Sequence, residues 1–389
     1  TGVRNTAVGS EAIRQKTTST DNTAVGFQTL YQSSEGNNNT AIGSYALTAN
    51  TTGADNVAVG KDALAANTTG GLNTAVGALA LDANTTGEKA VAVGRSALSA
   101  NTTGNRNCAV GYVALSANST GGYNTGIGNL ALYRNTTASY NTAVGYSSLL
   151  DNTTGDQNVA LGMEAMELNT TGGYNVAVGM RALESNTTAS NNTAVGYYAL
   201  QSNTTGTRNT AVGTNSLDAA QTANDNSAFG HQALSANTTG VDNCAFGANT
   251  LDANTEGHRN CAFGFQALTA NTTASDNTAF GHKALEANTT GTENVAVGAL
   301  ALDANTTADH NTAVGHNSMT TNTTGSENTA VGQGSLGSNQ TGSYNTGLGY
   351  GALVLNNTAN HNTAVGYNSL GTNTTGADNT SVGSASLDA

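Results

Sequence analysis

NTAVG, residues 22–26, is the stretch that decides the fold, because it returns every 17 residues along the whole 389-residue chain. Its glycine stands at Gly9 and Gly26 and recurs without insertion or deletion as far as Gly383, which makes 23 copies. A period this strict is typical of one short structural unit that stacks on itself. We number the positions of a copy from the Asn, so that Asn22 is position 1 and Gly26 is position 5.

The consensus of a copy is NTAVGxxALxANTTGxx, in which position 1 is Asn in 22 of 23 copies and Ala90 is the exception. The alternation within TAVG has the period of two of a strand, so we expect Thr and Val on one face and Ala on the other. The glycine at position 5 supplies a bend or a close backbone approach, and ALxA is a second short buried segment. The segment NTTG is typical of a turn, because Asn and Gly both tolerate a left-handed backbone conformation. A helix is excluded, because the apolar positions lack helical spacing and the Asn and Gly content is unfavourable.

The sequence therefore predicts an all-β fold: a parallel β-solenoid, or β-roll, with 17 residues in each of 23 coils. Residues 1–389 are expected to form one continuous tandem-repeat solenoid without an internal boundary, as a segment of a longer fibre. Each side chain would stack on its counterpart about 4.8 Å away, and ladders of Asn would satisfy their own amides. The structural ladder is expected to include Val8, Gly9, Val25, Gly26, Leu30, Leu47, Gly60 and Leu64.

A coil of 17 residues encloses little apolar volume, which leads to a prediction about assembly. We expect one Val, one Leu and two Ala to be buried in each turn, which hardly offsets the entropy of ordering the turn. The small residue at position 3 would then face other chains. The hypothesis is a homotrimer, a slender rod that could also extend end to end into a filament.

The charge of the chain excludes several partners. It carries 12 Lys and Arg against 25 Asp and Glu, a net charge of −13, which argues against nucleic acid and against anionic membranes. No apolar run reaches the roughly 18 residues that a membrane span needs, so we expect no membrane insertion in this segment. The three cysteines, Cys108, Cys244 and Cys261, all fall at position 2, and we expect free thiols.

No catalytic constellation is visible in the chain. The six histidines do not cluster, and we find no Ser-His-Asp set, no paired carboxylates and no phosphate loop. We therefore expect no enzyme activity, no cofactor and no metal. Position 6 varies freely and reads as solvated surface, although its aromatic members could form a stripe that binds sugars. These members are Phe27, Tyr112, Tyr146, Tyr197, Phe265, Tyr350 and Tyr367.

The Asn at position 12 begins an Asn-x-Thr triplet in 18 copies, which is the acceptor pattern for N-linked glycans. The alternative is that Asn and Thr are simply good turn and ladder residues. The candidate acceptors are Asn50, Asn67, Asn84, Asn101, Asn118, Asn135, Asn152, Asn169, Asn186, Asn203, Asn237, Asn271, Asn288, Asn305, Asn322, Asn339, Asn356 and Asn373.

The tandem phrase resembles the head repeats of trimeric autotransporter adhesins (YadA-like), and it is also similar to repeats in some phage tail fibres. The likeness rests on residues 7–9, 24–26 and 41–43 and their equivalents, in a variant longer than the repeats of that family. It implies a left-handed parallel β-roll that trimerises and serves surface adhesion.

These observations predict a non-catalytic structural or adhesive shaft, extracellular or on the surface of a cell or virion. The predicted partners are copies of the chain itself and surface glycans. Two alternatives stay open. Regular rows of Thr could bind ice, and the aromatic column could bind carbohydrate.

Overall fold

The computed structural model describes residues 2–15 and 18–388 of the chain. They divide into two compact units, a first that ends at Asn192 and a second that begins at Thr193. Each unit is described by itself. The repeat passes the division without a change of phase, and a single continuous solenoid stays a prediction.

Every regular element in the described ranges is a three-residue strand at positions 2 to 4 of a copy. The first unit contains β1 (Thr6–Val8), β2 (Thr23–Val25), β3 (Thr40–Ile42), β4 (Val57–Val59), β5 (Thr74–Val76), β6 (Val91–Val93), β7 (Cys108–Val110), β8 (Thr125–Ile127), β9 (Thr142–Val144), β10 (Val159–Leu161) and β11 (Val176–Val178). The second unit contains β12 (Thr193–Val195), β13 (Thr210–Val212), β14 (Ser227–Phe229), β15 (Cys244–Phe246), β16 (Cys261–Phe263), β17 (Thr278–Phe280), β18 (Val295–Val297), β19 (Thr312–Val314), β20 (Thr329–Val331), β21 (Thr346–Leu348), β22 (Thr363–Val365) and β23 (Thr380–Val382).

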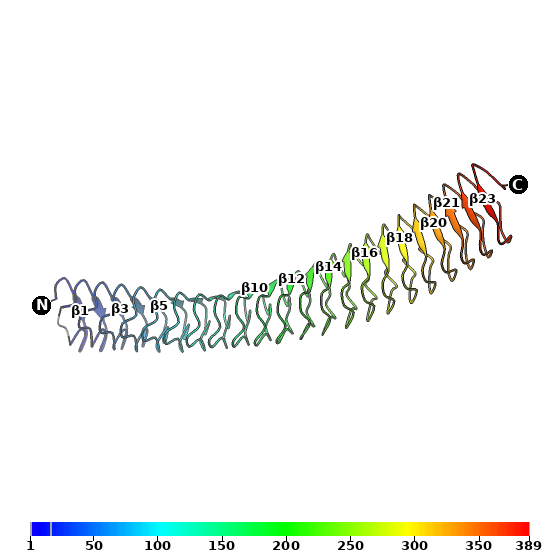
Figure 1. Ribbon diagram of the computed structural model, residues 1–389. Helices are drawn as coiled ribbons and strands as arrows, with labels where there is room; N and C mark the ends of the chain where they lie inside the picture. Colours follow the sequence, from blue (N-terminus) through cyan, green and yellow to red (C-terminus); the bar gives the residue numbers. More distant parts are fainter. Residues whose placement is uncertain (1, 16–17, 389) are drawn as a thin grey trace. The chain divides into compact units, whose positions relative to one another are not determined.

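Within each unit, consecutive strands pair in parallel and in register. Thr23 pairs with Thr40 and Ala24 with Ala41 in the first unit, and Ala211 pairs with Ala228 in the second. Figure 1 shows the strand arrows of each unit side by side in chain order. The predicted all-β, parallel β-solenoid with one 17-residue copy per turn is therefore confirmed.

The interior of each turn is lined by the small residue at position 3 and by the ALxA segment. Ala24, Ala41, Leu30 and Leu47 have no exposed surface. A Cβ added at Gly126, one of the two glycines at position 3, would lie 3.2 Å from Leu115 Cδ1 of the preceding turn. The small column thus packs against the Leu column of its own chain. The expectation that it faces other chains was wrong, because a turn this narrow leaves room only for Ala opposite Leu.

Position 4 points outward, on the side of the strand opposite to Ala. Val8 is 57% and Val25 is 36% exposed, so these two members of the expected ladder are stacked but are not core. The remaining ladder residues lie as expected, since Leu30, Leu47 and Leu64 are fully buried and Gly9, Gly26 and Gly60 stack on one another. The expected burial of one Val per turn was therefore wrong.

Positions 5 and 15 both favour glycine, but for different structural reasons. The position 5 glycines have φ between 130° and 142°, a region that only glycine occupies readily, and an added Cβ would collide with the carbonyl of the next turn. The position 15 glycines of the NTTG turn do not have positive φ. There a Cβ would instead crowd the next turn's carbonyl oxygen and the Asn side chain. Glycine is therefore favoured in this turn for lack of space and not for a left-handed conformation.

The left-handed residues lie elsewhere in the turn, at positions 7, 9 and 17. Leu149 has φ 54° and Met166 has φ 51°, and both are fully buried. A left-handed conformation costs a residue with a side chain roughly 1–2 kcal/mol. Burial of the Leu or Met side chain, neither of which is branched at Cβ, offsets that cost, since it is worth about 1.5–3 kcal/mol.

Candidate binding surfaces

The outward side chains of positions 17, 2 and 4 form one flat surface on each unit, which we call the strand face. Position 17 is mostly charged or aromatic, position 2 is Thr, Val, Cys or Ser, and position 4 is apolar. Ion pairs join neighbouring turns along position 17. In the second unit, Arg208 Nε donates to Asp225 at 2.6 Å and Arg259 Nε to Asp276 at 2.7 Å. These exposed pairs contribute little to stability, but they place charges at fixed heights beside the apolar column.

Four consecutive copies of the second unit carry Phe at position 4. We call Phe229, Phe246, Phe263 and Phe280 the Phe ladder. Their rings stack with centroid separations of 4.4, 4.6 and 4.5 Å and interplanar angles of 10°, 3° and 19°. The ring faces cover one another, and the ring edges point outward. Phe280 remains 48% exposed. An exposed apolar patch of this kind is typical of an interaction surface.

The cysteines lie on the strand face at position 2, next to the Phe ladder or its aliphatic equivalent. All three are free thiols, as expected. Cys244 and Cys261 are direct partners in the β15–β16 pair. Burial first, and then the charge and hydrogen bond of Cys261, raise the pKa of Cys244 to about 11. Burial also raises the pKa of Cys108. The thiols of Cys244 and Cys108 are therefore protonated and weakly nucleophilic at neutral pH.

The aromatic residues outside the Phe ladder do not form one continuous platform. Two rings at the same position of neighbouring turns stack on each other, as Tyr123 does on Tyr140 at 4.9 Å and Tyr350 on Tyr367 at 5.4 Å. A sugar that stacks on a ring needs an open ring face, so each such pair offers at most its outer faces. A shallow hollow of about 370 Å³ beside Tyr350 is lined by Gly334, Gly351 and Gln333, among others. It exists because glycine replaces the usual side chain at position 7 in both copies.

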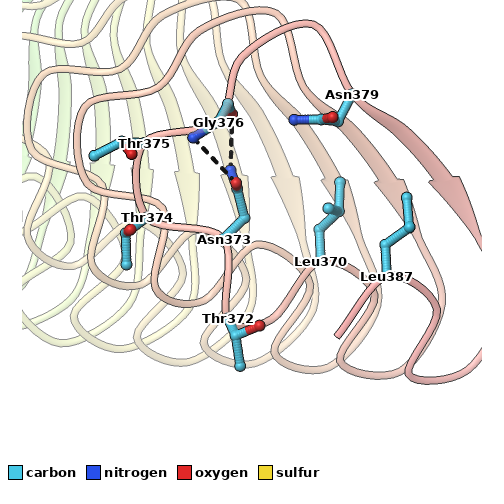
Figure 2. A pocket seen from close by; sticks show the side chains of 8 residues that line it. All are labelled: Leu370, Thr372, Asn373, Thr374, Thr375, Gly376, Asn379 and Leu387. Carbon is cyan, nitrogen blue, oxygen red and sulfur yellow. Dashed lines mark hydrogen bonds between the residues drawn. The ribbon is translucent and has the colours of Figure 1, made fainter. Parts of the chain in front are cut away.

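The NTTG turn forms a second surface, and its Asn residues point inward. Asn152 is typical: its Nδ2 donates to Asn135 Oδ1 at 2.8 Å and to the carbonyl oxygen of Gly155 at 3.0 Å. Its own Oδ1 accepts from Asn169 Nδ2 at 2.8 Å. Figure 2 shows the contact within one turn at Asn373, whose amide is directed at Gly376 while Thr374 and Thr375 lie on the outside of the turn.

The position 1 Asn forms a parallel ladder on the other side of the same carbonyl. Asn39 Nδ2 donates to Gly53 O at 2.9 Å, and Asn50 Nδ2 reaches that oxygen at the same distance. Asn22 Oδ1 in turn accepts from the backbone N–H of Asn39 at 2.8 Å. The expectation that stacked Asn satisfies its own amide is therefore confirmed. It holds because each side chain bonds to the turn above or below as well as to its own turn.

The 18 candidate glycan acceptors belong to the inward ladder. Seventeen of them have no exposed surface, and only Asn373 is half-buried. A glycan replaces one hydrogen of Nδ2, and in this ladder both hydrogens of Asn152 are in use inside the turn. The folded turn therefore leaves the amides of the seventeen buried acceptors no access to a sugar, and we do not include N-glycosylation in the function proposed below.

The two threonines of the turn differ from each other. The first donates its hydroxyl to the next turn, as Thr51 Oγ1 does to Thr68 O at 3.0 Å. The second is exposed, as at Thr52, Thr69 and Thr154. It forms a row of outward hydroxyls at the turn spacing. This row is the most regular polar surface of the described residues.

One acidic group in the described part of the chain has the spacing of metal ligands. Carboxylate oxygens of Glu164, Glu167 and Glu184 lie within 4.8 Å of one another. Arg181 lies beside them, with Nε 2.6 Å from Glu164 and 3.8 Å from Glu184. The guanidinium supplies the positive charge that the cluster needs, so the group reads as an ion-pair network.

No family model matches the chain, and a search of curated proteins finds no match either. The likeness to adhesin head repeats therefore rests on the repeated phrase alone. Within the described ranges, no helix is long and apolar enough to cross a lipid bilayer.

Proposed function

We propose that the chain is a non-catalytic structural segment, the shaft of an extracellular fibre such as a filament, an adhesin or a phage tail fibre. The observation that carries the proposal is the unbroken register within each unit, where strands pair residue for residue and buried Asn ladders join successive turns. Contacts that involve only the neighbouring turn let a protein gain length without a change of structure. Such a building plan suits a spacer on the surface of a cell or virion.

The number of chains in such a fibre needs a new argument. The expectation of three chains rested on an outward column of small residues, and that column lies inside the turn. The surface available to a partner is instead the strand face, with its exposed aliphatic and aromatic column. We therefore propose association through this face and do not retain the number three.

Negative-stain electron microscopy of the purified full chain tests the fibre proposal. We expect thin particles of constant width, because every turn has the same cross-section. Limited proteolysis is the companion experiment, and we expect the NTTG turns to resist cleavage since their amides are bonded between turns. Images of compact particles alone would refute the proposal.

A carbohydrate-binding role is a second candidate, favoured by the hollow next to Tyr350. A sugar could lie over the floor left by Gly334 and contact the side chain of Gln333. Saturation-transfer NMR with the methyl glycosides of glucose, galactose, mannose and N-acetylglucosamine tests it. Tyr350→Ala should abolish any transfer and Tyr146→Ala, on the first unit, should not.

Ice binding is favoured by the row of exposed second threonines, represented by Thr52, Thr69 and Thr154. A flat row of hydroxyls at one spacing can hold water in a fixed pattern. Thermal hysteresis of the purified chain measures this property directly, and a reading of zero removes the candidate.

A further inference from the structure

The strand face of the second unit carries a pattern with its own symmetry, centred between β15 and β16. We call each strand, with the position 17 residue before it, a rung of the strand face. The Phe ladder spans β14 to β17, which places two rungs on each side of this centre. Position 2 reads Ser227, Cys244, Cys261, Thr278 across the same four rungs, with the two thiols at the centre. A surface whose residues follow a similar order from its centre towards either end can bind a copy of itself across a two-fold axis.

We propose that this face binds a second copy of the chain, face to face, with the two stacks of turns running in opposite directions. The proposal rests on the association through the strand face proposed above and names its partner and register. The two-fold axis lies along the strands, midway between β15 and β16. Each rung then faces its mirror rung: β15 faces β16, β14 faces β17 and β13 faces β18 of the second copy.

The charges beside the ladder fit this register. Position 17 carries Asp242 before β15 and Arg259 before β16, so each lies opposite the other's equivalent in the second copy. Arg208, before β13, lies opposite Glu293, before β18. The axis produces each of these two attractive pairs twice.

The one unfavourable match is between Asp225 and Asp276, which face each other in this register. Both carboxylates already accept two hydrogen bonds from an arginine of their own chain. The pKa of each is held below its usual value, by the hydrogen bond from Arg208 and Arg259 respectively. Their charges are therefore compensated before the faces meet. A two-fold axis along the stack would instead set the charged column against the Phe ladder, which is unfavourable.

Shape and area also fit a pair. The position 2 side chains beside the Phe ladder, Ser227, Cys244, Cys261 and Thr278, are all small, so they leave the ladder accessible to a second copy. In this register the ring edges of the two Phe ladders meet at equal heights, so the two apolar columns cover each other and exclude water. Six turns spaced about 4.8 Å apart, each about five residues wide at about 3.3 Å per residue, give a footprint of roughly 500 Å² per chain. The pair buries about 1,000 Å² in total, which is the minimum expected of a specific interface.

Multi-angle light scattering of the full chain tests the pair. We expect about 77 kDa, twice the 38.7 kDa of one chain. Phe246→Thr with Phe263→Thr removes the rings, keeps a β-branched, strand-forming residue at position 4, and should halve the mass. The matched control, Val93→Thr with Val110→Thr on the strand face of the first unit, should leave the mass unchanged. A far-UV circular dichroism spectrum like that of the wild type confirms that each variant is folded.

A charge exchange tests the register independently of the Phe ladder. Arg259→Asp should raise the dissociation constant tenfold or more at low salt, because two aspartates then face each other. Adding Asp242→Arg restores the opposed pair between copies but not the Arg259–Asp276 pair within the chain. Recovery of the dimer in the double variant therefore supports the contact between copies, because the Arg259–Asp276 pair within the chain is still lost.

Several outcomes would overturn the inference. These are a wild-type mass of one or three chains, an equal loss of mass in the Val93 and Val110 control, or no recovery on charge exchange. The fibre proposal fails on different data, namely the electron micrographs, so the two failures can be told apart.

Discussion

A single isosteric change in the Asn ladder, Asn152→Asp, should open the turn around it. The side chain keeps its shape but loses both donors, so Asn135 Oδ1 and the carbonyl oxygen of Gly155 would each face a carboxylate oxygen inside the turn. Each buried polar atom left without a partner costs about 1–3 kcal/mol, and the residue is fully buried. We expect a loss of about 3–5 kcal/mol at pH 7, since an uncompensated buried charge costs about that much.

The effect should depend on pH in one direction. Burial among oxygen atoms raises the pKa of the new carboxyl above its unfolded value of about 3.9. The destabilisation is therefore complete above the folded pKa and fades as the pH falls towards the unfolded one. The protonated acid also recovers one donor. The variant at pH 4 should thus lie closer to the wild type than at pH 7.

Hydrogen exchange measured by mass spectrometry is the appropriate assay, because a long repeat protein opens locally and does not unfold in one step. The opening free energy of the segment 135–175 should fall in Asn152→Asp. The control is Gln157→Glu, the same amide-to-acid change at an exposed residue five positions away. Equal protection in the two variants would refute the view that the buried ladder holds successive turns together.

Four further predictions follow from the turn geometry. Gly145→Ala should destabilise its turn by about 2 kcal/mol or more, because φ is 136° and the new Cβ meets the backbone of the next turn. Gly155→Ala should cost less, since other copies carry Ala at that position. The thermal unfolding midpoints of the two variants compare these costs. Secretion from a host that attaches N-linked glycans should give an unmodified intact mass of 38.7 kDa, and a ladder of hexose masses would contradict the buried amides. Burial raises the pKa of Asp218, so the opening free energy of its turn should increase as the pH falls from 7 to 4 and Asp218→Asn should remove that dependence in hydrogen exchange. The pKa of about 11 at Cys244 should slow its alkylation by iodoacetamide at pH 8 roughly a hundredfold relative to the unfolded chain, and Cys261→Ser should recover part of the rate.

The repeat alone was enough to predict the class of fold. A fixed 17-residue period with an invariant glycine leaves one turn per copy, and the alternation in TAVG locates every strand. The buried Leu column at Leu30, Leu47 and Leu64 and the bonded Asn ladders could also be predicted. These features depend on contacts between identical positions, which the period itself implies.

The sequence could not say which side of the strand is inside. Positions 3 and 4 are both apolar, as at Ala24 and Val25, so alternation shows that they face opposite ways but not which of them lines the turn. The structure puts Ala inside because the Leu of position 9 already fills most of the narrow interior. The same choice brings Val and the Phe ladder to the surface, and with them the proposed interface.

Only the tertiary structure shows whether the Asn of the NTTG turn is buried or exposed. NTTG reads equally as a glycan acceptor and as a ladder residue, because both uses need only an Asn followed by Thr. Closure of the 17-residue turn carries the amide of Asn152 inward, where two acceptors lie at bonding distance. It also forces Leu149 into a left-handed conformation that local preference opposes. The 17-residue period determines which residues stack on one another. The small space inside the closed turn determines which side chains point inward and which atoms are in contact there.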